Sequence, residues 1–224
     1  MRHIKLFFTM ITLAVFSAAL FAGCGEAQEK KMPEEEVPEL ITYEATAISL
    51  NSDVNDGMNA GAEFTIKQRG DTLKIHGLVD GVARGMSHLQ HLHGFKDGTD
   101  AVCPDKDEAD KNGDGIIDLL ELREYSGITM IPLHGDPVNL EIKSDTYPTA
   151  GPNGEYQYES EILLSDLQKA VKEKFGIEEL DLTKFVIYIH GVENGDNLPE
   201  SVQSLEGVPA SVTLPVACAP IERE

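Results

Sequence analysis

Residues 62–79, AEFTIKQRGDTLKIHGLV, decide the fold class of this chain. Large apolar residues alternate with polar ones on both sides of a glycine-containing break, at Phe64, Ile66, Leu73 and Ile75. Side chains of a strand alternate between the two faces of a sheet, so the pattern predicts strands at 62–68 and 72–79, each with one buried face. The break at 69–71 is typical of a hairpin turn.

Working outward, similar patterns predict further strands at residues 43–51, 138–142, 156–164, 184–190 and 211–216. Residues 165–175 differ, because their apolar residues recur at helical spacing. We expect a short helix there, with Ser165 as its N-cap and Gly176 just after its last turn. Together with a histidine-rich strand, this predicts an all-β fold: a Greek-key β-sandwich or barrel of about eight strands. The folded domain is expected to span residues 43–224.

That histidine-rich strand is HLQHLH, residues 88–93. In a strand, His91 and His93 lie on one face, about 7 Å apart, and His88 lies on the opposite face. Two imidazoles on one face can bind copper, zinc, iron or nickel, with His88 as a supporting residue. A solvent-exposed strand end that happens to be rich in histidine is the alternative interpretation.

The first 23 residues resemble a bacterial lipoprotein signal peptide. Arg2 and Lys5 precede an apolar run that ends at Gly23-Cys24, although Phe21 stands where leucine is commoner. We expect Cys24 to be lipidated, and residues 24–42, which are acidic and poor in large apolar groups, to form a tether. The protein is therefore expected outside the cytoplasm, held to a membrane by lipid or, alternatively, by an uncleaved anchor.

Export also bears on the cysteines and on the charge. Once Cys24 is lipidated, Cys103 and Cys218 remain, and an isolated pair in an oxidising compartment is expected to form a disulfide. The net charge of −21 becomes −23 when Arg2 and Lys5 leave with the signal peptide. So acidic a protein is not expected to bind nucleic acid, whose phosphates require a basic surface.

Residues 110–121, DKNGDGIIDLLE, match the twelve-residue calcium loop of EF-hands. Gly115 occupies the position of the sharp turn, and Ile117 the position whose side chain packs inward. The expected calcium ligands are Asp110, Asn112, Asp114, Ile116 through its carbonyl, Asp118 and Glu121. An acidic surface loop without metal is the alternative. A single loop of this kind indicates a structural site, within an insertion at about residues 104–127, more than a sensor.

With these motifs placed, the chain resembles copper/zinc superoxide dismutase over about residues 43–221. The resemblance rests on GLVDG (77–81) leading into HLQHLH, on FVIYIH (185–190) and on LPVAC (214–218). It implies a Greek-key sandwich, copper bound by His91, His93 and His190, and His88 as the buried histidine behind them. It also implies the same disulfide, between Cys103 and Cys218.

HGDPVNL, residues 134–140, is the ambiguous segment. It is similar to the family's zinc-binding segment with one residue missing, which makes His134 and Asp136 residual zinc-type ligands. Alternatively, His134 takes the place of the histidine that bridges copper and zinc, and is then a copper ligand that delivers a proton. Only His134 lies between Cys103 and His190, so the usual zinc site is incomplete, and we expect calcium to organise this region instead.

Pro215 stands where the family places the arginine that attracts superoxide. Arg84 is one candidate for a substitute. The leading hypothesis is a copper-dependent superoxide dismutase-like lipoprotein, with superoxide as substrate and the membrane contacted through lipid. The alternatives are a non-catalytic copper-binding protein and a calcium-stabilised cell-surface module on the same fold. The sequence leaves the oligomeric state open.

Overall fold

A computed structural model describes residues 37–224 of the chain. The predicted signal peptide, Cys24 and most of the predicted tether lie outside these described residues. Within residues 37–224, no helix has the length and apolar character needed to cross a membrane.

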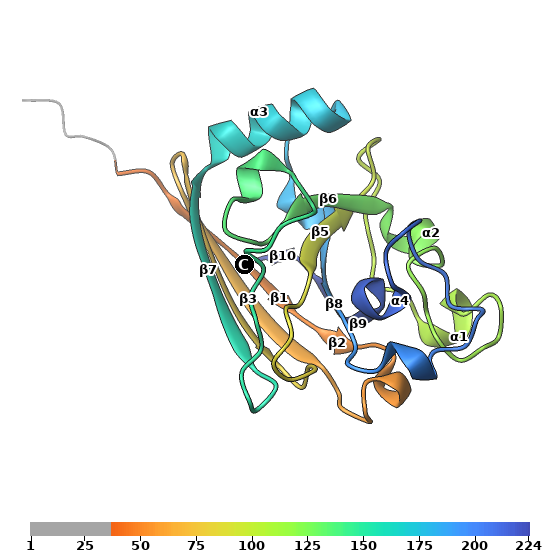
Figure 1. The fold of residues 1–224 in the computed structure, drawn as a ribbon. Coiled ribbons are helices and arrows are strands. Elements are labelled where there is room, and N and C mark those ends of the chain that lie inside the picture. Colours follow the sequence, from red (N-terminus) through yellow and green to blue (C-terminus); the bar gives the residue numbers. More distant parts are fainter. Residues whose placement is uncertain (1–36) are drawn as a thin grey trace, which may run out of the picture. The chain divides into compact units, whose positions relative to one another are not determined.

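Two five-stranded antiparallel sheets face one another (Figure 1). The first sheet has the order β10 (Glu222–Arg223), β1 (Leu40–Thr46), β3 (Gly61–Arg69), β4 (Thr72–Asp80) and β7 (Tyr156–Leu163). The second has the order β2 (Ile48–Ser49), β9 (Pro215–Pro220), β8 (Val186–His190), β5 (Gln90–Gly94) and β6 (Ile128–Pro132). The predicted all-β sandwich is thereby confirmed.

The helices are short and lie outside the sandwich (Figure 1). They are α1 (Lys106–Ala109), α2 (Arg123–Ser126), α3 (Leu164–Phe175) and α4 (Ala210–Thr213). Among residues 37–224, four 3-10 turns accompany them: η1 (Ser52–Val54), η2 (Pro137–Asn139), η3 (Leu182–Lys184) and η4 (Gly195–Asn197).

The β3–β4 hairpin forms where the sequence predicts it. Arg69 pairs with Thr72, and Gly70 in the turn has φ +58°, a conformation that glycine adopts without strain. Phe64, Ile66 and Leu73 are buried on the inner face, so the predicted alternation is confirmed.

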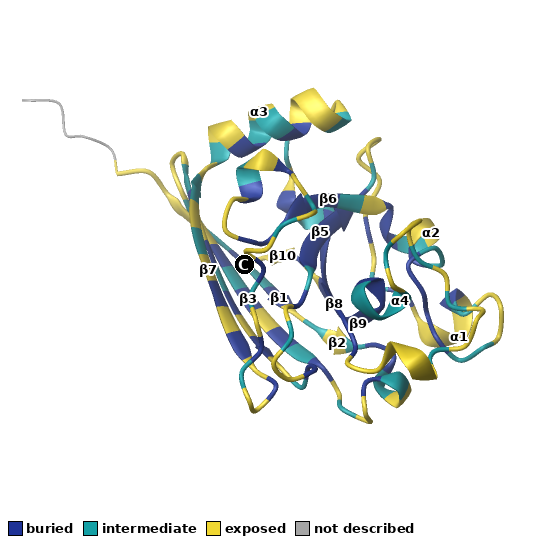
Figure 2. Ribbon diagram, in the orientation of Figure 1, coloured by how far each residue is buried: buried dark blue, intermediate teal, exposed yellow. Residues whose placement is uncertain are grey.

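The two sheets differ in how they meet solvent (Figure 2). Strands β3 and β4 alternate between buried and more exposed positions, whereas every residue of β5 and β8 is buried. The outer face of the second sheet is covered by a second apolar cluster that includes Ile117, Leu122 and Tyr188. The insertion therefore covers the outer face of the strands that carry the histidines, while the first sheet covers their inner face.

Two predicted strands are wrong. Residues 138–142 contain the 3-10 turn η2 instead, because Pro137 at its start fixes φ and lacks an N–H, and Leu140 at its end has φ +55°. Residues 211–216 contain α4 followed by the first residues of β9, which runs on to Pro220. Strand β6 was not predicted.

The first strand and the helix need smaller corrections. Strand β1 begins at Leu40, so the predicted tether, 24–42, extends too far into the fold. Helix α3 confirms the predicted helix and ends at Gly176 with φ +81°. Ser165 is not its N-cap: Asp71 in the β3–β4 turn accepts hydrogen bonds from the Ser165 amide at 2.8 Å and hydroxyl at 2.7 Å. A carboxylate from another part of the chain thus caps the helix, which local sequence cannot reveal.

Candidate metal centre

Three histidines converge on the outer face of the second sheet, the face that also carries Tyr188. His91 and His93 come from β5 and His190 ends β8, and their ring nitrogens offer three ligand atoms that lie within 4.8 Å of one another. The three side chains are buried, each at most 3% exposed. The cluster can therefore hold a metal ion, as the histidine pattern predicts, and the exposed-strand alternative is wrong.

Four ring nitrogens of the cluster have no hydrogen-bond partner. Both ring nitrogens of His91, Nδ1 of His93 and Nε2 of His190 are buried without a hydrogen bond. A buried polar atom without a partner costs about 1–3 kcal/mol, so such a concentration is rare in a folded protein. A metal ion would take one lone pair from each of the three rings, and the residues therefore fit one.

The opposite nitrogens of two of these rings are held by their surroundings. Nδ1 of His190 lies 2.8 Å from the carbonyl oxygen of Thr213 and so donates to it, which leaves Nε2 as the bare lone pair. Nε2 of His93 lies 2.9 Å from the Thr129 hydroxyl. Such partners orient an imidazole and raise its basicity as a ligand.

The environment keeps these imidazoles neutral. Burial lowers the pKa of His91 and of His93 well below the ordinary value, and proximity to His190 lowers both further. Burial also lowers the pKa of His190 to about 4, although its hydrogen bond to Thr213 acts in the opposite direction. Neutral imidazole is the form that binds metal, so near pH 7 protons do not compete for the site.

His88 supports the cluster from behind, as predicted. It is fully buried, and its ring nitrogens contact two backbone carbonyl oxygens, those of His190 at 3.0 Å and Ala83 at 2.8 Å. It therefore clamps the end of β8 to the loop before β5. With both nitrogens engaged, His88 has no free lone pair for a metal.

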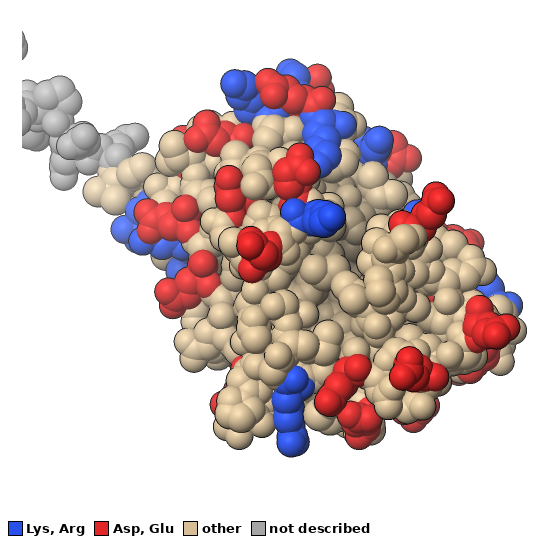
Figure 3. Space-filling model, viewed as in Figure 1, with Lys and Arg blue, Asp and Glu red and all other residues tan. Residues whose placement is uncertain are grey.

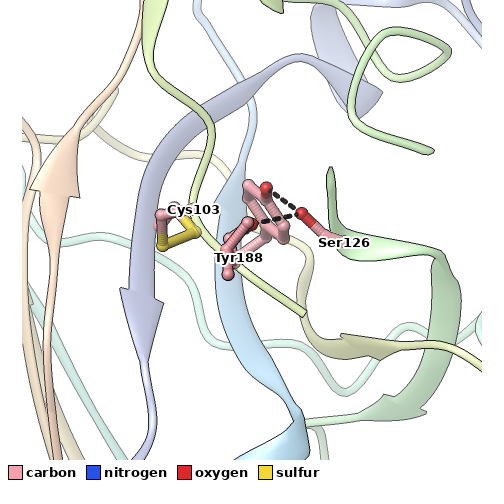
Figure 4. The surroundings of a disulfide bond; sticks show 5 residues. Cys103, Ser126 and Tyr188 are labelled. Carbon is pink, nitrogen blue, oxygen red and sulfur yellow. Dashed lines mark hydrogen bonds between the residues drawn. A yellow bond between two sulfur atoms is a disulfide. The ribbon is translucent and has the colours of Figure 1, made fainter. Parts of the chain in front are cut away.

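Aromatic rings enclose the histidines. Tyr147 packs edge-on against both His91 and His134, with ring centroids 5.6 and 5.0 Å away. Tyr188 packs against His93 at 4.7 Å, and its hydroxyl lies 2.6 Å from that of Ser126 (Figure 4). These rings exclude water from the cluster.

The predicted disulfide between Cys103 and Cys218 is present. Cys218 in β9 pairs with Tyr188 in β8, and Ser126 also donates to the carbonyl oxygen of Val102, next to Cys103 (Figure 4). The disulfide thus ties the insertion to the strands that carry the histidines.

His134 is not brought into the cluster as a fourth ligand. Its Nε2 donates to the carbonyl oxygen of Glu141 at 2.7 Å, and its Nδ1 accepts from the amide of Asp136 at 3.0 Å. Both ring nitrogens of His134 are therefore hydrogen-bonded within the 134–141 loop. Neither is free to bind copper or to deliver a proton, which were the roles predicted for this residue. The carboxylate of Asp136 is exposed, and only its backbone contacts His134, so these residues do not form a zinc-type pair here.

The predicted calcium loop folds around its own carboxylates. The Asp110 carboxylate accepts from three amides, those of Gly113, Asp114 and Gly115. The Glu121 carboxylate reaches back to the amides of Lys111 and Asn112 and also accepts from Asp118. Gly115 has φ +85°, as expected for the sharp turn. Calcium at the six named ligands stays a prediction.

Sequence reasoning missed the residue that docks this loop. Asn51 donates to the carbonyl oxygens of Ile117 and Pro215, and its own side-chain oxygen accepts from the Ile117 amide, all at 2.9 Å. In sequence, Asn51 merely ends a strand pattern. Thr129, Thr213 and Tyr147 were missed for the same reason, because their contacts join segments far apart in the chain.

Acidic and basic side chains are interspersed on the face shown in Figure 3, and no continuous basic surface covers it. No protein-family model matches the chain, and a search of curated proteins found no match either. The resemblance to copper/zinc superoxide dismutase therefore rests on the sequence motifs alone.

Proposed function

We propose that this protein binds copper at His91, His93 and His190 and disproportionates superoxide at the cell surface. The single observation that carries the proposal is the set of buried, neutral imidazoles whose ring nitrogens converge without other partners. The two-sheet architecture and the disulfide pairing, both implied by the family resemblance, support it further.

We favour copper on two grounds, the donor set and the family resemblance. The converging atoms are all imidazole nitrogens, a set that suits copper, zinc, iron and nickel but disfavours calcium and magnesium. Among the described residues both cysteines are held in the disulfide, so no thiolate is available as a further ligand. Among these metals we choose copper, because the histidine motifs resemble those that bind copper in copper/zinc superoxide dismutase.

Bound copper supplies one-electron transfer, by which two superoxide ions and two protons become dioxygen and hydrogen peroxide. The chain's own residues bind the ion, orient its ligands and shield the site from water. His91, His93 and His190 would hold the ion. Thr129 and Thr213 fix the ring orientation of two of them, and Tyr147 and Tyr188 keep bulk water away. Protons would come from solvent, because both nitrogens of His134 are engaged in its loop.

The test is copper binding and turnover in one preparation. The folded domain, residues 37–224, is loaded with copper, and bound metal and superoxide disproportionation are measured. We expect one equivalent of copper and rapid turnover. The His91→Ala/His93→Ala variant should lose both, whereas His76→Ala should lose neither, because His76 lies half-exposed on the other sheet. Copper-independent turnover, or absence of copper binding, would refute the proposal.

A non-catalytic copper-binding protein is the second candidate. The observation that favours it is the burial of all three ligands together with a buried Pro215 where the family has its arginine. Stoichiometric copper without turnover in the same experiment would establish this alternative.

Calcium and the lipid anchor complete the proposal. Calcium at residues 110–121 would order the insertion that covers the second sheet, and acylated Cys24 would hold the protein to a membrane. Calcium binding is tested by a calorimetric titration of the parent chain and of the Glu121→Gln variant. Lipidation of Cys24 is tested by mass spectrometry of the protein isolated from membranes, since an unmodified N-terminus would contradict it.

A further inference from the structure

One segment contacts both the predicted calcium loop and the surroundings of the candidate metal centre. This connecting segment, residues 198–205, lies between η4 and α4, and Figure 1 shows it in blue beside the yellow-green insertion. Leu198 and Val202 pack against the main apolar core, so the connecting segment is attached to the sandwich itself. It is therefore placed to transmit a change in the insertion to the strands that carry the histidines.

The first set of contacts joins the connecting segment to the calcium loop. The Asp114 carboxylate accepts a hydrogen bond from the Ser201 hydroxyl at 2.6 Å, and the Asp118 carboxylate accepts one from the Gln203 amide at 2.7 Å. Asp118 is 1% exposed, so its bond to Gln203 is shielded from water. Asp114 and Asp118 are two of the six predicted calcium ligands, so the connecting segment is bonded directly to that site.

Calcium and the connecting segment can use these two carboxylates at the same time. An ionised carboxylate has two oxygens and can accept several partners. In Asp114 and in Asp118, Oδ2 accepts from the connecting segment, whereas Oδ1 accepts from amides of the loop itself. The loop gathers four carboxylates that repel one another, and a divalent cation among them replaces this repulsion by attraction. Calcium would therefore hold in place the carboxylates to which the connecting segment is bonded.

The second set of contacts joins the connecting segment to His190. The hydroxyls of Ser204 and Thr213 lie 2.7 Å apart, and the carbonyl oxygen of Thr213 accepts from Nδ1 of His190 at 2.8 Å. The other ring nitrogen, Nε2, is the one that is free to bind metal. Thr213 therefore sets the direction in which Nε2 points, and Ser204 holds Thr213 in place.

We propose that calcium in the loop raises the copper affinity of the histidine cluster through the connecting segment, and that Ser204 is a positioning residue for His190. The connection runs through two adjacent residues, because Gln203 is bonded to Asp118 and Ser204 to Thr213. The inference rests on the proposed function, since it requires copper at the histidines and calcium at residues 110–121, but it does not require turnover. Coupling between two binding sites is reciprocal, so copper raises the calcium affinity by the same factor.

The test measures copper affinity with and without calcium. The protein is freed of both ions, and its affinity for Cu(I) is measured by competition with a chromophoric chelator that binds Cu(I) but not calcium. Coupling between sites typically changes affinity by about 5- to 150-fold, and we expect saturating calcium to tighten copper binding about five- to tenfold. Calorimetric titration with calcium, in the presence and absence of copper, should give the same factor.

Four variants locate the coupling. Ser204→Ala should bind calcium as the parent chain does, but the effect of calcium on copper affinity should fall below about twofold. Ser204→Thr keeps the hydroxyl and should restore the effect, and Glu121→Gln should lose it together with calcium binding. Ser160→Ala is the matched control, because Ser160 lies in β7 of the other sheet and should leave both affinities unchanged. Thermal unfolding of each variant verifies folding, which the partly buried Ser204 should not control.

The outcomes separate this inference from the proposed copper site. Copper affinity that calcium leaves unchanged or weakens would overturn the inference and leave the copper site standing. A calcium effect that persists in Ser204→Ala would overturn it too, because the connection would then run elsewhere. A protein that binds copper but no calcium would have the same consequence. A protein that binds no copper at all would overturn both the inference and the proposed function.

Discussion

Asn51 joins the insertion to the sandwich, and replacing it gives the sharpest test of how the fold is held together. Its side chain is 4% exposed and makes three buried hydrogen bonds, two with the backbone of Ile117 and one with the carbonyl oxygen of Pro215. Pro215 in turn pairs with His190, the candidate metal ligand. The Asn51→Ala variant therefore releases the predicted calcium loop at its most buried residue, Ile117.

The magnitude follows from these contacts. Each buried polar group left without a partner costs about 1–3 kcal/mol, so three lost bonds at the lower end amount to about 3 kcal/mol. Asn51 also has φ +52°, a conformation that asparagine tolerates but alanine enters at a further cost of about 1–2 kcal/mol. We expect Asn51→Ala to lower the free energy of unfolding by about 4 kcal/mol, and Asn51→Gly by about 1 kcal/mol less, since glycine accepts this backbone without strain.

Urea unfolding at fixed calcium concentration measures these values, and limited proteolysis shows whether residues 104–127 become accessible. Asn153→Ala is the matched control, because Asn153 is exposed and its loss should change stability by no more than about 0.5 kcal/mol. A loss below about 1 kcal/mol in Asn51→Ala would refute the reasoning, since it would mean that Ile117 docks through its side chain alone.

Three further predictions concern the acid response, the disulfide and one glycine. In the metal-free protein His190 has its pKa lowered to about 4, below its unfolded value near 6.5, so unfolding takes up a proton between these pH values and stability falls as the pH drops through that window. His190 alone should cost roughly 3 kcal/mol by pH 4, measured by urea titration, and a flat profile there would contradict its burial as a neutral ring. The Cys103→Ser/Cys218→Ser variant opens a loop with a sequence separation of 115 residues, and chain entropy predicts a loss of about 5 kcal/mol, to be checked by chemical denaturation against the oxidised protein. Stability within about 1 kcal/mol of the parent would argue that the insertion stays docked without the bridge. Gly127→Ala places a Cβ 2.1 Å from a backbone oxygen, whereas Gly113→Ala, at a similar positive φ, meets nothing within 4 Å. Both variants carry the backbone strain of an alanine at positive φ, but only Gly127→Ala adds the steric clash. The melting temperature of Gly127→Ala should therefore lie well below that of Gly113→Ala, and equal melting temperatures would show that β5 and β6 can move apart at little cost in stability.

Local pattern was sufficient wherever one residue type dictates one conformation. The alternation around Phe64 and Leu73, the glycine of the β3–β4 turn and the helical spacing of 165–175 all predicted what the structure contains. Residues 138–142 show the limit of this reasoning. Their apolar residues resemble a strand, but Pro137 starts a 3-10 turn and a short pattern cannot overcome it.

For the candidate site, the sequence by itself determined the ligand types. His91 and His93 share a strand face because side chains alternate, and the cysteine count predicted the disulfide. The family resemblance implied His190 as a third ligand, and the tertiary structure places it beside the other two. Only the tertiary structure decided that both ring nitrogens of His134 are hydrogen-bonded within its own loop and that Asn51 docks the insertion. The physical reason is that strand periodicity is a local property of the backbone. Hydrogen-bond satisfaction, burial and shared cavities depend on segments that meet only after the two sheets have packed.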